Sequence, residues 1–229
     1  MHTPITHCPQ CHVKDFIKNG KSGGRQRYKC KSCQYNFTVP QLGKRIDRYY
    51  VRLSLRLYLE GLGFRSIERI VGVSHVSVMN WVKKYGKELK ALRLCKKESI
   101  EAVEVDELHS YVGSKKYVWL WLALDRVGKQ VLGFTIGDRS EQTGDRLGRQ
   151  LRKMSVTTYY TDHWKAYASI FPPDKHVQSK RETYNIEGLN GRIRHYLARF
   201  RRKTKCYSKS KEMMEYSLYL LFNHLTMLN

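Results

Sequence analysis

Two pairs of cysteines near the start of the chain constrain its fold more than any other feature. Cys8 and Cys11 form one Cys-x-x-Cys unit, and Cys30 and Cys33 form a second unit after 18 intervening residues. Each unit places two thiolates on one tight turn. Four sulfur ligands at about 2.3 Å complete a tetrahedral zinc site with no open position for catalysis. Two disulfides are the alternative, which the adjacency of the pairs and the lack of a secretory signal disfavour. The spacing therefore predicts a structural Zn²⁺ site.

The charge of the chain indicates the class of its partner. The 229 residues include 43 Lys and Arg against 20 Asp and Glu, which gives a net charge of +23. A field of that size favours polyanions, and nucleic acid is the commonest of these. No apolar run approaches the roughly 18 residues of a membrane span, so we expect a soluble, cytoplasmic protein.

The charge is unevenly distributed. Residues 1–98 carry a net charge of +15, and residues 163–229 carry +8. Residues 99–162 are neutral, with nine basic and nine acidic side chains. An enzyme that holds metal ions against a phosphodiester needs carboxylates between cationic arms. An ordinary domain between two basic ones would give the same balance.

A helix-turn-helix is predicted after the cysteine module. Apolar spacing indicates helices over 46–58, 66–71 and 74–85. In the turn between the last two, Gly72 permits a positive φ, Val73 fills the core and Ser74 caps the next helix. Towards DNA we expect His75, Val76, Met79, Asn80 and Lys83 in the major groove, Arg69 and Lys84 near the backbone, and Arg25 and Arg27 on a basic strand of the cysteine module.

The periodicity changes after residue 99, because residues 103–106 alternate between apolar and acidic, as in a half-buried strand. The further predicted elements are strands at 117–125, 130–137 and 157–161, helices at 141–154, 164–170, from 186 and at 213–228, and hairpin turns at 113–115 and 126–129. This order is similar to a ribonuclease H-like fold. The resemblance implies that the first and fourth strands are adjacent.

Three acidic residues are candidates for catalysis. Asp106 lies on the first of these strands, Asp162 ends the fourth, and Glu187 opens a helix. Three converging carboxylates repel one another unless cations neutralise them, as two divalent ions about 3.5–4 Å apart would do. Oxygen ligands favour Mg²⁺ or Mn²⁺. Each residue could instead be a structural cap, and the competing carboxylates are Glu104, Glu107, Asp125, Asp138 and Glu182.

Basic and polar residues follow the third candidate. Glu187, Asn190 and Arg194 share one helix face, away from the apolar stripe. The basic side chains expected to hold the DNA backbone are Arg199, Arg201, Arg202, Lys203, Lys205 and Lys209. Trp119 and Trp121 are expected in the core.

These landmarks resemble, over nearly the whole length, the Asp-Asp-Glu transposases of the insertion-sequence-one family of bacterial and archaeal mobile elements. The motifs that carry the resemblance are the paired cysteines, the helix-turn-helix, Val105-Asp106-Glu107, Ala123-Leu124-Asp125-Arg126, Thr161-Asp162-His163-Trp164 and Asn185-Ile186-Glu187 with Asn190 and Arg194.

The resemblance implies a mixed α+β multidomain chain. The expected parts are a zinc ribbon at 1–42, a helix-turn-helix at 43–86, a linker at 87–99, and a ribonuclease H-like catalytic domain with a C-terminal helix at 100–229. Asp106, Asp162 and Glu187 would form a catalytic triad that holds two Mg²⁺ or Mn²⁺ ions.

The activity implied is binding of terminal inverted repeats, cleavage of the element ends and strand transfer into target DNA. A homodimer or larger assembly on DNA would be needed to act on two ends, and the nucleoid is the expected location. The alternatives are a non-catalytic repressor derived from a transposase, or a nuclease of the same fold.

Overall fold

The computed structural model describes residues 5–38, 41–42, 45–92, 94–95, 97–113 and 116–228. The chain forms two compact units, Met1–Val82 and Lys83–Asn229. Among the residues that the structure describes, no helix combines the length and the apolar character needed to cross a membrane.

The first unit begins with a small antiparallel sheet. Its strands, in spatial order, are β1 (Phe16–Ser22), β2 (Arg25–Cys30) and β3 (Asn36–Phe37). A further pair, β4 (Gln41–Leu42) and β5 (Arg45–Ile46), follows. The small core of the cysteine module consists of Cys8, Cys30 and Phe37, with Phe16 and Tyr28 packed against them. So few apolar residues bury little surface, which is why such a module depends on a bound metal.

Three helices complete this unit, namely α1 (Arg48–Leu59), α2 (Phe64–Val71) and α3 (His75–Lys90), whose last eight residues belong to the second unit. Gly72 has a φ of 80° and its amide donates to the carbonyl of Glu68, which ends α2. Val73 is buried, and the hydroxyl of Ser74 accepts from the amide of Val76. The predicted turn chemistry is therefore confirmed.

Helix α3 is longer than expected, since it runs to Lys90 rather than to Tyr85. The reason lies in its packing within the second unit against α7 (Lys211–Leu228). A Cβ at Gly86 would lie 2.4 Å from the Cβ of Tyr216, so glycine allows a close approach. Lys90 also forms an ion pair with Glu215. Residues 83–90 are thus packed helix. Of the expected linker after Lys90, the described residues 91–92, 94–95 and 97–98 form neither helix nor strand.

The second unit is built on a five-stranded sheet in the spatial order β10-β9-β6-β7-β8. The strands are β6 (Ser99–Val112), β7 (Lys116–Asp125), β8 (Val131–Gly137), β9 (Ser155–Thr161) and β10 (His176–Gln178). The first three form an antiparallel meander, and β9 runs parallel to β6. The predicted adjacency of the first and fourth strands is confirmed. Of the expected 113–115 turn, Ser114 and Lys115 lie outside the described residues.

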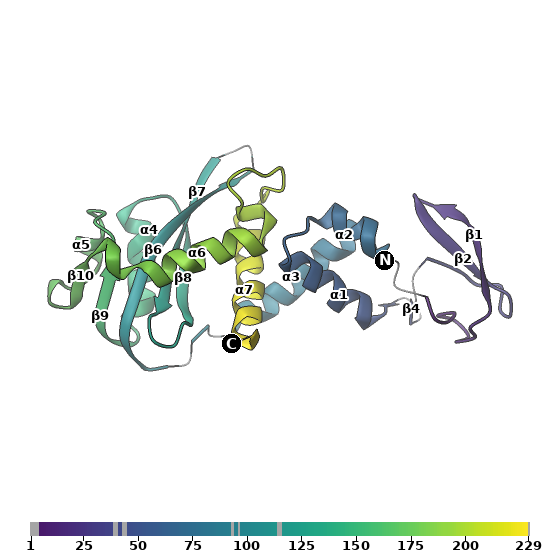
Figure 1. Cartoon of the computed structure of the whole chain (residues 1–229), viewed down its shortest axis with the longest axis horizontal. Coiled ribbons are helices and arrows are strands. Elements are labelled where there is room, and N and C mark those ends of the chain that lie inside the picture. Colours follow the sequence, from purple (N-terminus) through teal and green to yellow (C-terminus); the bar gives the residue numbers. More distant parts are fainter. Residues whose placement is uncertain are drawn as a thin grey trace. The chain divides into compact units, whose positions relative to one another are not determined.

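Helices cover both faces of this sheet (Figure 1). On one face, α4 (Glu141–Leu151) and α5 (Tyr167–Ile170) enclose a core with Val103, Val105 and Trp121. At Gly144 a Cβ would lie 2.7 Å from the ring of Trp121, so only glycine lets α4 approach so closely. On the other face, α6 (Tyr184–Tyr196) crosses β6. Alternate residues of β6 therefore face α4 and α6.

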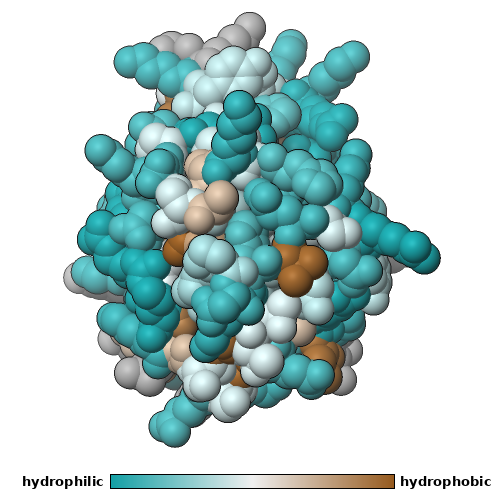
Figure 2. All heavy atoms as spheres, turned by 90° about the vertical axis from the view of Figure 1, so that its left-hand side faces the viewer, coloured by the Kyte–Doolittle hydropathy of each residue, from teal (hydrophilic) through white to brown (hydrophobic). Residues whose placement is uncertain are grey.

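The outer surface shows little apolar concentration on the side drawn in Figure 2. That face is mostly hydrophilic, and its apolar residues form small separate spots. The predicted class, a mixed α+β chain with a cysteine module followed by an α/β unit, is confirmed.

Candidate active site and metal centre

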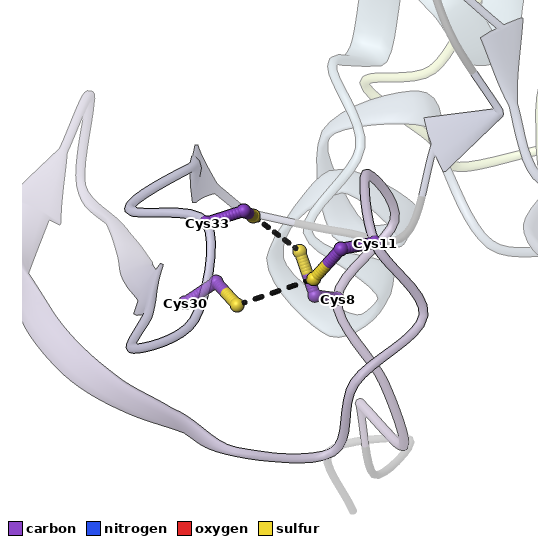
Figure 3. A group of neighbouring side chains, drawn as sticks. All are labelled: Cys8, Cys11, Cys30 and Cys33. Carbon is purple, nitrogen blue, oxygen red and sulfur yellow. Dashed lines mark hydrogen bonds between the residues drawn. The ribbon is translucent and has the colours of Figure 1, made fainter.

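The four paired cysteines converge in the first unit. Among the described residues they are the one group of three or more His, Cys, Asp or Glu side chains whose ligand atoms all lie within 4.8 Å of one another. Their sulfurs point to a common centre, with 3.6 Å between Cys8 and Cys33 and 3.5 Å between Cys11 and Cys30 (Figure 3). A tetrahedral Zn²⁺ with bonds of about 2.3 Å needs sulfurs roughly 3.8 Å apart. The donor set therefore fits zinc.

The backbone at the two cysteine pairs repeats the same geometry. His12 and Gln34, each following a second cysteine, have φ values of 59° and 62°. Their amides donate to the carbonyls of Cys8 and Cys30. These tight turns are what bring two thiols together, and the amide of Cys33 is the main cause that lowers the pKa of Cys30 to about 6. The amide of Tyr35 lowers the pKa of Cys33, but burial and the neighbouring thiols outweigh it and raise this pKa to about 12. Cys30 is therefore the more readily deprotonated of the two for metal binding.

The three candidate carboxylates come from separate elements of the second unit. Asp106 lies on β6 at the face towards α6, where the amide nitrogen of Asn190 donates to its Oδ2 at 2.7 Å. Glu104 pairs with Tyr160 in the parallel register of β6 and β9, so Asp162 follows at the level of Asp106. Glu187 lies in the first turn of α6.

The electrostatics of Asp106 link the three. Burial raises its pKa to about 7, and the charges of Glu107, Asp162 and Glu187 add to the increase, while the backbone amide of Glu107 opposes it. The three candidates therefore share one electrostatic neighbourhood. Their carboxylate oxygens do not form a group as close as that of the four cysteine sulfurs.

Two competing carboxylates are bound to Arg126. Glu104 is fully buried and accepts from the side chain of Asn185 and from the amide of Ile186 at 2.9 Å, which anchors the start of α6. The guanidinium of Arg126 lies 3.6 Å from Glu104 and 2.5 Å from Glu182. Both carboxylates are thus neutralised within the fold.

The other three competitors also have partners. Glu107 pairs with Arg139 at 2.6 Å and accepts from the hydroxyl of Tyr167. Asp125 pairs with Lys97 at 2.7 Å. Asp138 accepts from the hydroxyls of Ser140 and Thr143 at the start of α4, and these bonds lower its pKa to about 2.

In contrast, no described Lys or Arg forms a salt bridge with the three candidate carboxylates. Asp106 has the amide of Asn190, and Asp162 accepts from the amide of Trp164 at 2.9 Å. Arg194 is a basic residue whose pKa is affected by the charge of Asp106, which raises it against the effect of burial. Burial lowers the pKa of Arg194, and its Nε is buried without a hydrogen-bond partner. The Oδ1 of Asn190 is also buried and unpartnered. Unpaired negative charge beside an orphan acceptor is what a cation would satisfy.

The predicted DNA-binding side chains fall into two groups by exposure. Exposed in the structure are Arg69, Val76, Met79, Asn80, Lys83, Lys84, Arg201, Arg202, Lys203, Lys205 and Lys209. The rest are tied to the fold to differing degrees. Arg25 lies 3.5 Å from Glu68, Arg27 donates to the carbonyl of Asn19, and His75 lies 2.8 Å from Glu68.

Arg199 needs a correction as a surface cation. It is 7% exposed, and its Nη1 donates to the hydroxyl of Ser208 at 2.8 Å. The hydroxyl of Ser110 in turn donates to the Arg199 carbonyl, so this residue joins the loop after α6 to β6. Its side chain therefore serves the interior in this structure.

The ion pairs of Arg126 and the partial exposure of Trp119 were not predicted from the sequence. A single arginine after a strand gives no signal of the two carboxylates it joins, 22 and 56 positions away. Trp119 was expected in the core, but it is only half-buried, with the guanidinium of Arg139 at 4.6 Å.

Comparison with known proteins identifies both units. The family model described as IS1 transposase matches residues 99–225, and the InsA N-terminal zinc-ribbon model matches residues 1–34. The first range contains Asp106, Asp162 and Glu187, and the second contains all four paired cysteines.

Named relatives agree. Insertion element IS1 4 protein InsB of Escherichia coli (strain K12) is 40% identical over 115 residues, which are 50% of this chain and 69% of that protein. Insertion element IS1 protein InsB of Shigella flexneri is 39% identical over 115 residues, 50% of this chain and 88% of that protein. Insertion element iso-IS1n protein InsB of Shigella dysenteriae is 37% identical over 113 residues, 49% and 86% respectively. The chain belongs to the IS1 transposase family.

Proposed function

We propose that this transposase binds the terminal inverted repeats of an insertion sequence and catalyses metal-dependent cleavage and strand transfer. In this proposal the zinc ribbon (1–42) and helix-turn-helix (43–86) recognise the ends, and residues 100–229 catalyse the reaction after a linker at 87–99. Asp106, Asp162 and Glu187 are the proposed catalytic residues.

The observation that carries the proposal is the difference in charge compensation among the carboxylates of the second unit. Each of the five other candidate carboxylates is paired with a cation or with capping hydroxyls. The half-buried Asp106 has no such partner, and the negative charges of Asp162 and Glu187 help to raise its pKa. Uncompensated carboxylates within β6, directly after β9 and in the first turn of α6 are suited to divalent ions.

The proposed chemistry is direct phosphoryl transfer. Two Mg²⁺ or Mn²⁺ ions held by Asp106, Asp162 and Glu187 would supply Lewis-acid stabilisation of the attacking and leaving oxygens. The amide of Asn190 fixes one oxygen of Asp106, and so orients the other. Arg194, close enough to feel the charge of Asp106, would add positive charge beside the phosphate.

The DNA contacts proposed outside this centre use exposed residues. The outer face of α3 presents Val76, Met79 and Asn80 for base contacts. The loop after α6 presents Arg201, Arg202, Lys203, Lys205 and Lys209 for phosphates. Because two element ends must be cut together, we propose a homodimer or larger assembly on DNA.

An Asp106→Asn variant of the full chain tests the proposal with duplex element ends, a plasmid target and Mg²⁺. The substitution preserves shape but removes a ligand charge. Cleavage and joining should therefore fall by more than the roughly 100-fold typical of residues that only orient a ligand. End binding, measured by mobility shift, should persist.

Glu101→Gln is the matched control, because Glu101 is exposed on the same strand. It should cleave and join like the parent. Joined products from the parent identify a transposase, cuts without joining identify a nuclease, and shifts without cuts identify a repressor. Joining that survives Asp106→Asn would overturn the assignment of the triad.

A further inference from the structure

Six rings form a continuous row on the face of the sheet opposite α6. From one end they are Tyr207, Tyr111, Tyr117, His109, Trp119 and Trp164, hereafter the aromatic row. Neighbouring ring centroids are 4.9 Å apart for Tyr207 and Tyr111 and 4.8 Å apart for Tyr111 and Tyr117. The row continues at 5.9 Å to His109 and 5.5 Å to Trp119. The guanidinium of Arg139 then bridges Trp119 and Trp164, at 4.6 and 5.0 Å.

The row follows from the register of two strands. Tyr111 pairs with Tyr117 and His109 pairs with Trp119 in the antiparallel ladder of β6 and β7. Directly opposite residues project to the same face at close spacing. The hydroxyl of Tyr111 donates to that of Tyr117 at 3.2 Å. The rings are therefore held by the sheet and by one another.

The end at Tyr207 is fixed by the loop that follows α6. The amide of Gly113 donates to the carbonyl of Ser208 at 2.9 Å, and Ser208 bridges to Val112. In Figure 1 this loop lies beside the end of the β6–β7 hairpin. The same loop carries the exposed Arg201, Arg202, Lys203, Lys205 and Lys209. Rings and cations thus occur together.

The exposure of these rings is not explained by packing. Tyr117 is 66% exposed, and Tyr111, Trp119 and Tyr207 are half-buried. A ring that served only the core would be covered. Exposed rings beside a cationic loop are the combination with which proteins hold single-stranded nucleic acid, because phosphates pair with the cations while base faces stack on the rings. In a duplex the base faces are covered, so the rings favour unpaired nucleotides.

We infer that the aromatic row is a stacking surface for unpaired nucleotides of the DNA on which the enzyme acts. This inference rests on the proposed function and names the form of its substrate. One end of the row lies near the catalytic residues, since Trp164 donates its amide to Asp162. Tyr111 is five residues along β6 from Asp106, so its side chain lies on the opposite face of the sheet from the Asp106 carboxylate.

Equilibrium binding of the zinc-loaded full chain tests the inference without catalysis. The probes are a 20-nucleotide oligothymidylate and a 20-base-pair duplex of unrelated sequence, each labelled for fluorescence anisotropy, in buffer without Mg²⁺ or Mn²⁺. Tyr117→Ala should weaken oligothymidylate binding at least about fivefold and change duplex binding less than about twofold. Tyr117→Leu, which keeps apolar area but no ring, should behave like Tyr117→Ala. Tyr117→Trp should bind as the parent does.

Val127→Ala is the control, because Val127 has the same 66% exposure but lies in the turn after β7. It should leave both affinities unchanged. Parent-like oligothymidylate binding by Tyr117→Leu, or equal losses on both probes in Tyr117→Ala, would overturn the inference. Asp106→Asn separates the two proposals. If it keeps the parent's cleavage while the Tyr117 variants lose oligothymidylate binding as expected, the triad fails and the stacking surface stands.

Discussion

Asp106 is held in place by a neutral amide. The bond from Asn190 crosses from α6 to β6, and the remaining amide oxygen of Asn190 is buried without a hydrogen-bond partner. A neutral donor orients the carboxylate but leaves its negative charge available. At the residue scale, this is the difference between Asp106 and the ion-paired Glu107 beside it.

Asn190→Ala removes that orientation. We expect cleavage of element ends to fall about 10- to 100-fold, as for other residues that orient metal ligands. The concentration of Mn²⁺ needed for half-maximal cleavage should rise. Cleavage rates measured across a Mn²⁺ titration check both effects.

Asn223→Ala supplies the comparison. Its amide also makes one hydrogen bond, to the carbonyl of Tyr219, but on α7. The concentration of Mn²⁺ that Asn223→Ala needs for half-maximal cleavage should match that of the parent. Identical metal titrations for Asn190→Ala and Asn223→Ala would contradict an orienting role for Asn190.

At the scale of elements, helix α6 is joined to the sheet at its first turn. Glu104 receives two hydrogen bonds from the start of the helix and lies beside Arg126, all in a buried setting. A carboxylate at a helix N-terminus also interacts favourably with the helix dipole. Since Glu187 and Asn190 follow on the same helix, this anchor sets their position over β6.

Glu104→Ala should lower the free energy of unfolding by about 3–5 kcal/mol, because it leaves part of a buried charged group unpaired. Urea unfolding followed by tryptophan fluorescence measures this, as Trp119, Trp121 and Trp164 all lie in the second unit. Glu101→Ala, exposed on the same strand, should change the value by no more than about 0.5 kcal/mol. Equal stabilities of the two variants would refute the anchor.

At the scale of the whole molecule, the two units differ in what stabilises them. The second has a large apolar core around Trp121, Leu147 and Tyr167. The cysteine module of the first has Phe37 and two cysteines as its buried centre. We therefore expect the module to depend on a bound metal, whereas the second unit has a large apolar core of its own.

Cys33→Ser should reduce bound zinc from about one ion per chain to almost none, since zinc binding supplies roughly 10–16 kcal/mol to such modules. Trypsin should then cut within residues 14–31 while a fragment of the second unit persists. Zinc analysis and timed digestion provide the measurements. Cys206→Ser, at an exposed cysteine outside the group, should retain zinc and resist digestion. Retained zinc in Cys33→Ser would contradict the predicted ligand set.

Local chemistry was predictable from the sequence, because it depends on neighbouring residues. The turn at Gly72-Val73-Ser74 and the convergence of the cysteine pairs are examples. The resemblance to a ribonuclease H-like fold also implied the adjacency of β6 and β9, which the structure confirms. The catalytic roles of Asp106, Asp162 and Glu187 stay predictions.

What could not be predicted depends on register and on distant partners. The three-residue strand β10 is too short to give a periodic signal. The burial of Arg199 follows from a bond to Ser208 that its basic surroundings conceal. The aromatic row exists because β6 and β7 pair in one register, and a shift by one residue would separate its rings.

The two ion pairs of Arg126 have a consequence for where divalent metal ions would bind in the second unit. Without that guanidinium, Glu104 and Glu182 would become a second pair of unbalanced carboxylates near the first. Such a pair could capture divalent ions where they serve no chemistry. By occupying that position, Arg126 leaves Asp106, Asp162 and Glu187 as the proposed metal ligands, without a rival pair at Glu104 and Glu182.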